Sequence, residues 1–236
     1  MGNAAAKQVE SAVVVDASTL AIDESSSIAS SLVTKEKMSA KVKGMSMNTW
    51  VNASTGDILY SCKNKGLIKS HAILLDAEEN EVAIVVTAKK GMTTSTLYIC
   101  KKTPSFEGQK AASDEDLKKA GIEEGTELYV FAVIDSKRGM ASGKGTYSLV
   151  TGEGKDEDDF ELKEMYNAEK LSSMGYQAIF KEAESENIIA KAATKGVSMT
   201  PTIEFTKGVD LVALIMLGQT LAGDGSAGAL AGAGVV

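Results

Sequence analysis

Seven lysines in the first half of this 236-residue chain have the spacing of an anion-binding rim. They fall at or beside the ends of predicted strands: Lys63, Lys65, Lys69, Lys89, Lys90, Lys101 and Lys102. Lysine binds phosphate groups as a point charge, so two or three of these side chains on one rim could hold an anionic phospholipid headgroup. The alternative is a solvated surface, on which lysines discourage pairing between sheet edges.

The charge of the chain is unevenly distributed. The net charge is −7, but residues 35–102 carry 11 Lys and 6 acids, a net of +5, and residues 103–236 carry 13 Lys plus Arg and 22 acids, a net of −9. The first half could therefore face an anionic surface, and the second half could not. An acidic chain with 5 Phe and 1 Trp lacks the basic domain and stacking aromatics of a nucleic-acid partner.

Residues of catalytic or metal-binding type do not form a known pattern. His71 is the single histidine, Cys62 and Cys100 lie on separate predicted strands, and these residues are too few for a four-ligand zinc site. Residues 139–146 resemble a phosphate-binding loop but have the wrong glycine spacing, and residues 156–161 lack the glycine of a calcium loop. We therefore expect no enzyme, no cofactor and no metal, and keep an enzyme built on Cys62 and His71 as an alternative from another class.

The N-terminus offers a lipidation site. Met1-Gly2-Asn3 opens the chain, and the first seven residues resemble the myristoylated start of the catalytic subunit of cyclic-AMP-dependent kinase. Gly2 is the acceptor in such starts, and the alternative is an ordinary Met-Gly start. No secretory signal precedes the body of the chain, so we expect a cytoplasmic protein, held peripherally at a membrane if Gly2 is acylated.

The most apolar segment is 210–222, which is apolar on every helical face. A helix without a polar stripe must be surrounded by protein, and at 1.5 Å per residue this one is about 20 Å long, too short to cross a membrane. We predict a buried core helix with Leu214 in its middle. Asp210 is expected to cap its first turn.

The rest of the chain is mostly strand-like. Short apolar runs separated by Gly, Asn and Asp turns predict ten strands: 49–52, 58–62, 72–75, 82–87, 96–100, 127–134, 146–150, 176–181, 188–193 and 202–205. Residues 77–99 and 183–205 align without a gap, and 113–121 reads as a short surface helix. Two similar meandering halves and one apolar helix indicate a closed barrel with the helix inside.

Three features resemble the tubby C-terminal-like superfamily, in particular its LURP-one-related and phospholipid-scramblase-like branch. The hairpin at 50–60 has a Gly-centred turn, the order of partner strand, acidic turn, strand and basic turn occurs twice, and the junction Gly208-Val209-Asp210 leads from the last strand into the apolar helix. The resemblance implies a mainly β fold: a closed barrel of about twelve strands around a central hydrophobic C-terminal helix. It implies no reaction, because members differ in function.

These observations predict a flexible tail over 1–36, a barrel domain over 37–222, with insertions at 113–125 and 151–170, and a flexible Gly/Ala-rich tail over 223–236. The expected function is a non-enzymatic, membrane-associated binding or adaptor module that recognises anionic phospholipid headgroups. A scramblase-like lipid-handling protein is the alternative. The sequence does not identify a protein partner.

Overall fold

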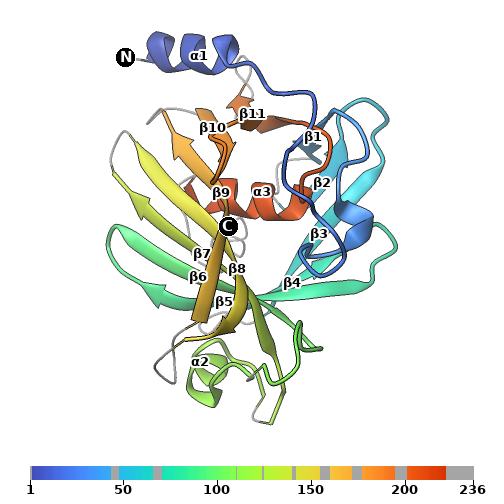
Figure 1. Ribbon diagram of the computed structural model, residues 1–236, viewed down its shortest axis with the longest axis vertical. Helices are drawn as coiled ribbons and strands as arrows, with labels where there is room; N and C mark the ends of the chain where they lie inside the picture. The colour runs from blue at the N-terminus through green and yellow to red at the C-terminus, as the bar shows by residue number, and fades with distance from the viewer. Residues whose placement is uncertain are drawn as a thin grey trace, which may run out of the picture.

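Twelve antiparallel strands close into a barrel (Figure 1). The computed structural model describes residues 2–43, 48–65, 71–109, 111–123, 125–139, 142–154, 160–171, 177–194 and 201–221. The strands are β1 (Met38–Val42), β2 (Thr49–Asn52), β3 (Ile58–Lys65), β4 (His71–Leu75), β5 (Glu81–Lys90), β6 (Thr94–Lys101), β7 (Tyr129–Arg138), β8 (Gly143–Glu153), β9 (Phe160–Lys170), β10 (Gln177–Glu182), β11 (Ile188–Thr194) and β12 (Pro201–Phe205).

Each strand pairs with its neighbours in the sequence, and β1 closes the ring by pairing with both β2 and β12. Closure leaves no free sheet edge. The duplicated segments of the sequence correspond to two similar units, in which a turn precedes a pair of antiparallel strands, β5 with β6 and β11 with β12. In both turns a glutamate adopts a positive φ, 65° at Glu79 and 58° at Glu186.

The ten predicted strands are all present, and the structure adds β1 and β9. The interpretation of 151–170 as an insertion is wrong, because 160–170 forms β9 between β8 and β10. The first half of β9 is charged and exposed on successive residues, so its sequence lacks the alternation that indicates a strand. Its pairing with β8 extends along nearly the whole strand and supplies the stability that its own side chains do not.

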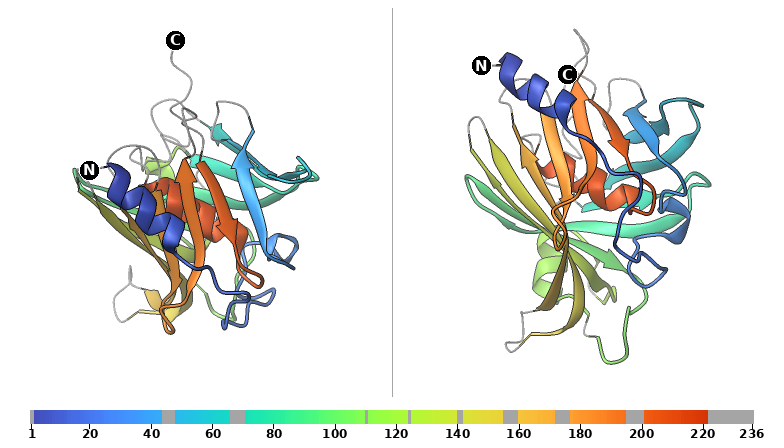
Figure 2. Two further views of the ribbon diagram at one scale, coloured as in Figure 1. Left: turned by 90° about the horizontal axis from the view of Figure 1, so that it is seen from above. Right: turned by 45° about the horizontal axis from the view of Figure 1, so that its top comes forward.

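The apolar C-terminal segment forms α3 (Leu211–Leu221), and ten of its eleven residues are buried. The helix lies within the ring of strands and packs chiefly on β7, β8 and β9 (Figure 2). Gly145 on β8 permits this close packing, since a Cβ at that position would lie 2.9 Å from Cδ1 of Leu217. No helix in the described part of the chain is both long and apolar enough to cross a membrane.

The segment before β1 differs from the expected flexible tail. It forms α1 (Gly2–Ser11), then an extended stretch with a short 3-10 turn at Ser30–Leu32, all lying against the barrel. Its scattered apolar side chains, among them Val9, Val14 and Ile28, are buried. Val9 and Ala5 are four residues apart on the buried face of α1, whereas Val14 and Ile28 lie on the irregular chain that follows and have no regular spacing. That irregular part was not visible in the sequence.

A buried carboxylate fastens this N-terminal segment to the barrel. Glu182, the last residue of β10, accepts hydrogen bonds from the backbone N–H and the hydroxyl of Thr19 and from the hydroxyls of Ser18 and Ser185. Burial alone would raise the pKa of Glu182, but these donors lower it to about 2. The carboxylate therefore stays ionised at neutral pH.

A second, smaller core lies outside the barrel at one end. The short helix α2 (Asp114–Lys119), predicted as a surface helix, covers β5 with Leu117 and Ala120. These side chains join Leu128, Val130 and Cys100 in an apolar cluster. The connection between β6 and β7 is thus a small cover rather than a loose loop.

The buried position of α3 predicts the response of its central residue. Leu214→Ala should lower the free energy of unfolding by about 2 to 5 kcal/mol, because it leaves a cavity in a closed core. Leu214→Asp should abolish cooperative folding, because an unpaired charge would be buried there. Chemical denaturation measures both, with Leu162→Ala as control, since Leu162 is 42% exposed. A cooperatively melting Leu214→Asp protein would contradict the position of α3.

Candidate functional site

Four exposed lysines lie together at one end of the barrel. Because neighbouring strands are antiparallel, all odd-numbered strands end at the same end. Lys89 and Lys90 end β5, Lys137 lies one residue before the end of β7, and Lys144 is the second residue of β8, all four with exposed side chains. The strand register places them on neighbouring strands. Thr94, the first residue of β6 after the β5–β6 hairpin, is paired with Lys137 of β7, and Lys137 is paired with Lys144 of β8. We call these four lysines the basic end.

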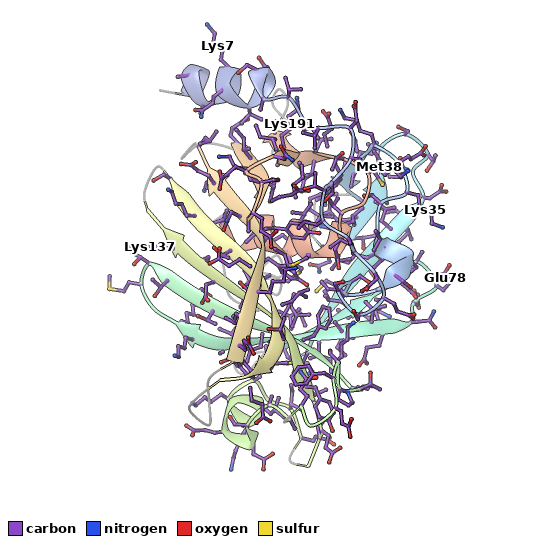
Figure 3. All side chains as sticks on the ribbon, in the orientation of Figure 1. Lys7, Lys35, Met38, Glu78, Lys137 and Lys191 are labelled. Atoms are coloured by element: carbon purple, nitrogen blue, oxygen red, sulfur yellow. The ribbon has the colours of Figure 1, made fainter. Side chains whose placement is uncertain are left out.

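The opposite end of the barrel is acidic. Its turns and strand ends expose the carboxylates of Asp57, Glu78, Glu79, Glu123, Glu153, Glu161, Glu184 and Glu186. Three exposed lysines, Lys102, Lys163 and Lys207, also lie at this end, where the carboxylates outnumber them. Figure 3 shows Lys137 and Glu78 on opposite sides of the molecule. At the basic end the nearby carboxylates are Asp135, which accepts a hydrogen bond from Thr96, and Glu169, which faces Lys144 across β8 and β9. The charges are thus separated along the barrel, and not only along the sequence.

The seven predicted lysines do not form one cluster. Lys89 and Lys90 belong to the basic end, and Lys65 ends β3 on the same side, although its side chain lies outside the described structure, as does the whole of Lys69. Lys63 pairs with Glu79 at 3.8 Å and Lys102 with Glu81 at 3.0 Å. These two cations are therefore partly neutralised by neighbouring carboxylates.

Lys101 lies near the start of α3, at the opposite end from Lys89. Its Nζ donates to the carbonyl oxygen of Ser27 at 2.8 Å and lies 3.7 Å above the ring of Phe131. Burial lowers the pKa of Lys101, while the charges of Asp210 and Glu24 oppose that shift. This half-buried amine holds the N-terminal segment against the barrel and is not placed to meet a membrane together with Lys89.

Asp210 caps α3, as the sequence predicts. Its Oδ1 accepts from the N–H of Ala213 at 2.9 Å, and its Oδ2 accepts from the N–H of Ile28 at 2.6 Å. The carboxylate thus serves the helix and the N-terminal segment together. Burial raises the pKa of Asp210 to about 6, against the lowering effect of these donors and of Lys101.

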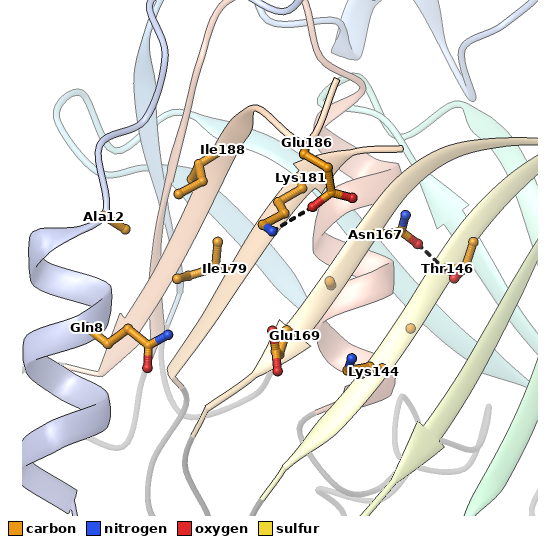
Figure 4. Close-up of a pocket in the computed structure, with 12 residues that line it drawn as sticks. Gln8, Ala12, Lys144, Thr146, Asn167, Glu169, Ile179, Lys181, Glu186 and Ile188 are labelled. Carbon is orange, nitrogen blue, oxygen red and sulfur yellow. Dashed lines mark hydrogen bonds and ion pairs between the residues drawn. The ribbon is translucent and has the colours of Figure 1, made fainter. Parts of the chain in front are cut away.

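A groove lies between α1 and the outer wall of the barrel (Figure 4). Its volume is about 550 Å³. Ile179, Ile188 and Ala12 give it apolar patches, and the Lys181–Glu186 ion pair of 2.6 Å spans one part of it. Lys144 and Glu169 line another part, so both signs of charge are present. The lining of the groove therefore does not favour an anion.

Cys62 and His71, the two candidate catalytic residues, have different environments. Cys62 is buried among the residues of the barrel core, and burial raises the pKa of its thiol to about 12, which keeps it protonated. His71 contacts the carbonyl oxygen of Ala120 on the α2 side, with Nδ1 at 3.2 Å. The two side chains do not form a nucleophile and base pair. Among the described residues, no group of three or more His, Cys, Asp or Glu could hold a metal.

Lys137 and Lys144 are the members of the basic end that sequence reasoning missed. Both lie in the acidic second half of the chain, so a sum of charges over each half of the sequence assigns them to the acidic surface. The signal that could have found them is the basic residues on both sides of the connection, because β7 ends in Lys137 and Arg138 and Lys144 is the second residue of β8. Of residues 139–146, considered as a phosphate loop, Gly143 to Thr146 are the start of β8.

No family model and no curated protein matches the chain. Among solved structures, an X-ray structure of a protein from Arabidopsis thaliana aligns with 79% of this chain and 90% of that one, at 16% sequence identity and a TM-score of 0.46.

The raised pKa of Asp210 predicts a pH-dependent contribution to stability. Between pH 4 and 6 the folded protein binds the proton that the unfolded chain releases, so this group's stabilisation is full below about pH 4 and is lost as the pH rises through 6. The free energy of unfolding of the wild type, minus that of Asp210→Asn, should therefore fall by up to about 3 kcal/mol from pH 4 to 7. Denaturant titrations at each pH measure it. A difference that stays constant or rises would contradict a raised pKa.

Proposed function

We propose that this chain is a non-enzymatic, peripheral membrane-binding or adaptor module whose basic end contacts anionic phospholipid headgroups. The observation that carries the proposal is the separation of charge between the two ends of the barrel, with Lys89, Lys90, Lys137 and Lys144 exposed together at one of them. A chain of net charge −7 would be repelled as a whole. An oriented barrel presents only its basic end.

The dimensions of the barrel make this orientation effective. β8 has eleven residues and spans about 35 Å at 3.3 Å per residue, several times the Debye length of about 8 Å at physiological salt. The carboxylates at the far end are then screened from a membrane that the lysines touch. Each lysine near an anionic leaflet contributes about 1 kcal/mol of attraction.

The tubby-like assignment belongs to this proposal. A closed twelve-strand antiparallel barrel, with a buried helix that follows the last strand through Gly208-Val209-Asp210, supports it. Gly208 has the φ of +81° that this tight junction requires, and its N–H donates to the carbonyl oxygen of Thr34. The identity of a protein partner remains outside what these features indicate.

Acylation of Gly2 stays a prediction, and α1 gives it a geometric context. Val9 of α1 packs with Leu171 and Ala193, near the ends of β9 and β11, so α1 points its first residue toward the basic end. In the shared orientation of Figures 1 and 3, the start of α1 and Lys137 lie on the same side. A single acyl chain binds membranes only marginally, and the lysines would supply the second attachment.

Gly2→Ala should therefore reduce membrane association in eukaryotic cells without changing the melting temperature. The reason is that the acyl chain is transferred only to an N-terminal glycine. Mass spectrometry of the N-terminal peptide and fractionation of the cell lysate measure the two halves of this prediction. An unmodified wild-type glycine would remove acylation from the proposal and leave the lysines as its only support.

Charge reversal at the basic end tests the proposal itself. The Lys89→Glu/Lys90→Glu double variant should weaken binding to phosphatidylserine-containing vesicles by about 2 kcal/mol or more, roughly thirtyfold, since two attractions are lost. Binding of the wild type should also fall steeply with added salt. Vesicle sedimentation at two salt concentrations measures both.

The matched control is Lys118→Glu/Lys119→Glu, which reverses an adjacent pair of exposed lysines on α2, in the connection between β6 and β7. This variant has the same net charge as the first, so the proposal predicts nearly wild-type binding for it. Equal losses in the two double variants would show that net charge alone matters. Salt-insensitive binding would contradict an electrostatic site.

A further inference from the structure

One large apolar side chain stands at the basic end in full contact with solvent. Met92 lies at the tip of the hairpin between β5 and β6, and its side chain is completely exposed. Among the described residues, the other exposed large apolar side chains are less exposed: Val13 is 78% exposed, and Ile58 and Leu162 are near 40%. Single exposed apolar residues are common on protein surfaces, so the meaning of Met92 depends on its neighbours.

Those neighbours are cations on a fixed turn. Lys89 and Lys90 precede the tip, and Lys137 faces Thr94 on the adjoining strand. The N–H of Gly91 donates to the carbonyl oxygen of Thr94 at 2.8 Å, which closes the turn and directs residues 92 and 93 away from the barrel. The hairpin is thus a short, hydrogen-bonded projection with an apolar tip and a basic base.

The sequence repeats this arrangement at the same end. A basic residue, a glycine and an apolar residue follow the ends of four other odd-numbered strands, as Lys43-Gly44-Met45, Lys65-Gly66-Leu67, Arg138-Gly139-Met140 and Lys195-Gly196-Val197. The apolar residues of these four triplets lie outside the described structure. Gly139 nevertheless shows the same bond as Gly91, from its N–H to the carbonyl oxygen three residues later, at 2.7 Å.

The same triplet occurs once at the other end, and there its environment differs. Lys207-Gly208-Val209 leads into α3, and Val209 is fully buried in the barrel core. The triplet alone therefore does not expose its apolar residue. What distinguishes 90–92 is its place on a hairpin tip at the basic end.

We propose that the hairpin around Met92 inserts into the interface of an anionic bilayer, with Lys89, Lys90 and Lys137 at the level of the headgroups. This inference rests on the proposed function and adds an apolar component to it. Lysine stems also bury apolar surface while their ammonium groups stay in the headgroup region. Methionine suits the role because it is unbranched and adapts to irregular surroundings.

The proposal separates two contributions that experiment can distinguish. Attraction through lysines weakens with salt, whereas burial of an apolar side chain is largely insensitive to moderate salt. Loss of Met92 should therefore lower binding at every salt concentration by a similar factor. Loss of the lysines should lower it mainly at low salt.

The first experiment measures partitioning of Met92→Ser into phosphatidylserine and phosphatidylcholine vesicles by sedimentation. We expect binding about tenfold weaker than that of the wild type, since part of the transfer energy of a methionine side chain is lost. Val13→Ser is the matched control, because it removes another strongly exposed apolar side chain that is not at the basic end. It should bind as the wild type does.

The second experiment places a reporter at the tip. Met92→Trp should shift its emission to shorter wavelength on binding and be quenched by brominated acyl chains in the vesicles. The native Trp50 is 1% exposed in the barrel core, so its signal is a constant background given by the wild type. Glu78→Trp, at the acidic end, should be unaffected.

Each result has a distinct meaning. Vesicle binding that depends on Lys89 and Lys90, with Met92→Ser binding normally and Met92→Trp unquenched, would overturn the insertion and leave the proposed function in place. Absence of binding by the wild type to anionic vesicles would overturn both. Quenching at residue 78 as well as at residue 92 would contradict the orientation on which the insertion depends.

Discussion

The burial of α3 is the constraint on which the rest of this structure depends. A helix that is apolar on every face has no stable position in water, and ten of the eleven residues of α3 are buried against the barrel. The start of the helix needs a cap, and Asp210 supplies it from inside the core. Because that buried carboxylate also accepts from Ile28, the N-terminal segment is tied to the same point. Burial of α3 thus accounts for the closed barrel, for the cap by Asp210 and for the attachment of the N-terminal segment.

The barrel divides the polar surface into two ends, and the turns at those ends differ in composition. Turns that follow even-numbered strands are rich in glutamate and aspartate, while the strand ends at the other side carry Lys89, Lys90, Lys137 and Lys144. Neither set is needed to close the barrel, because backbone pairing and the interior side chains do that. The difference between the ends is therefore available for recognition, and the proposed attraction of anionic headgroups depends on it.

The sequence predicted the β architecture and α3 because these depend on local pattern: short apolar runs between turn residues, and one segment without a polar face. It missed β9, whose charged first half shows no alternation. It took the N-terminal segment for a flexible tail because α1 is short and Val14 and Ile28, on the irregular chain after it, follow no period. The candidate site could be only partly predicted from the sequence, for a similar reason. Lys89 and Lys90 were identified, but Lys101 turns toward Ser27, and Lys137 and Lys144 join the basic end through strand register, which a single sequence does not state.

The proposed function requires one orientation of the barrel at a membrane. The solvent accessibility of the two barrel ends on bound protein measures that orientation directly. Spin labels at Thr93→Cys and Glu78→Cys report the two ends separately, because the native Cys62 and Cys100 are buried. On phosphatidylserine-containing vesicles, the label at residue 93 should lose collisions with a water-soluble nickel complex, and the label at residue 78 should keep them. Protection at residue 78, or equal accessibility of both labels on bound protein, would contradict the account.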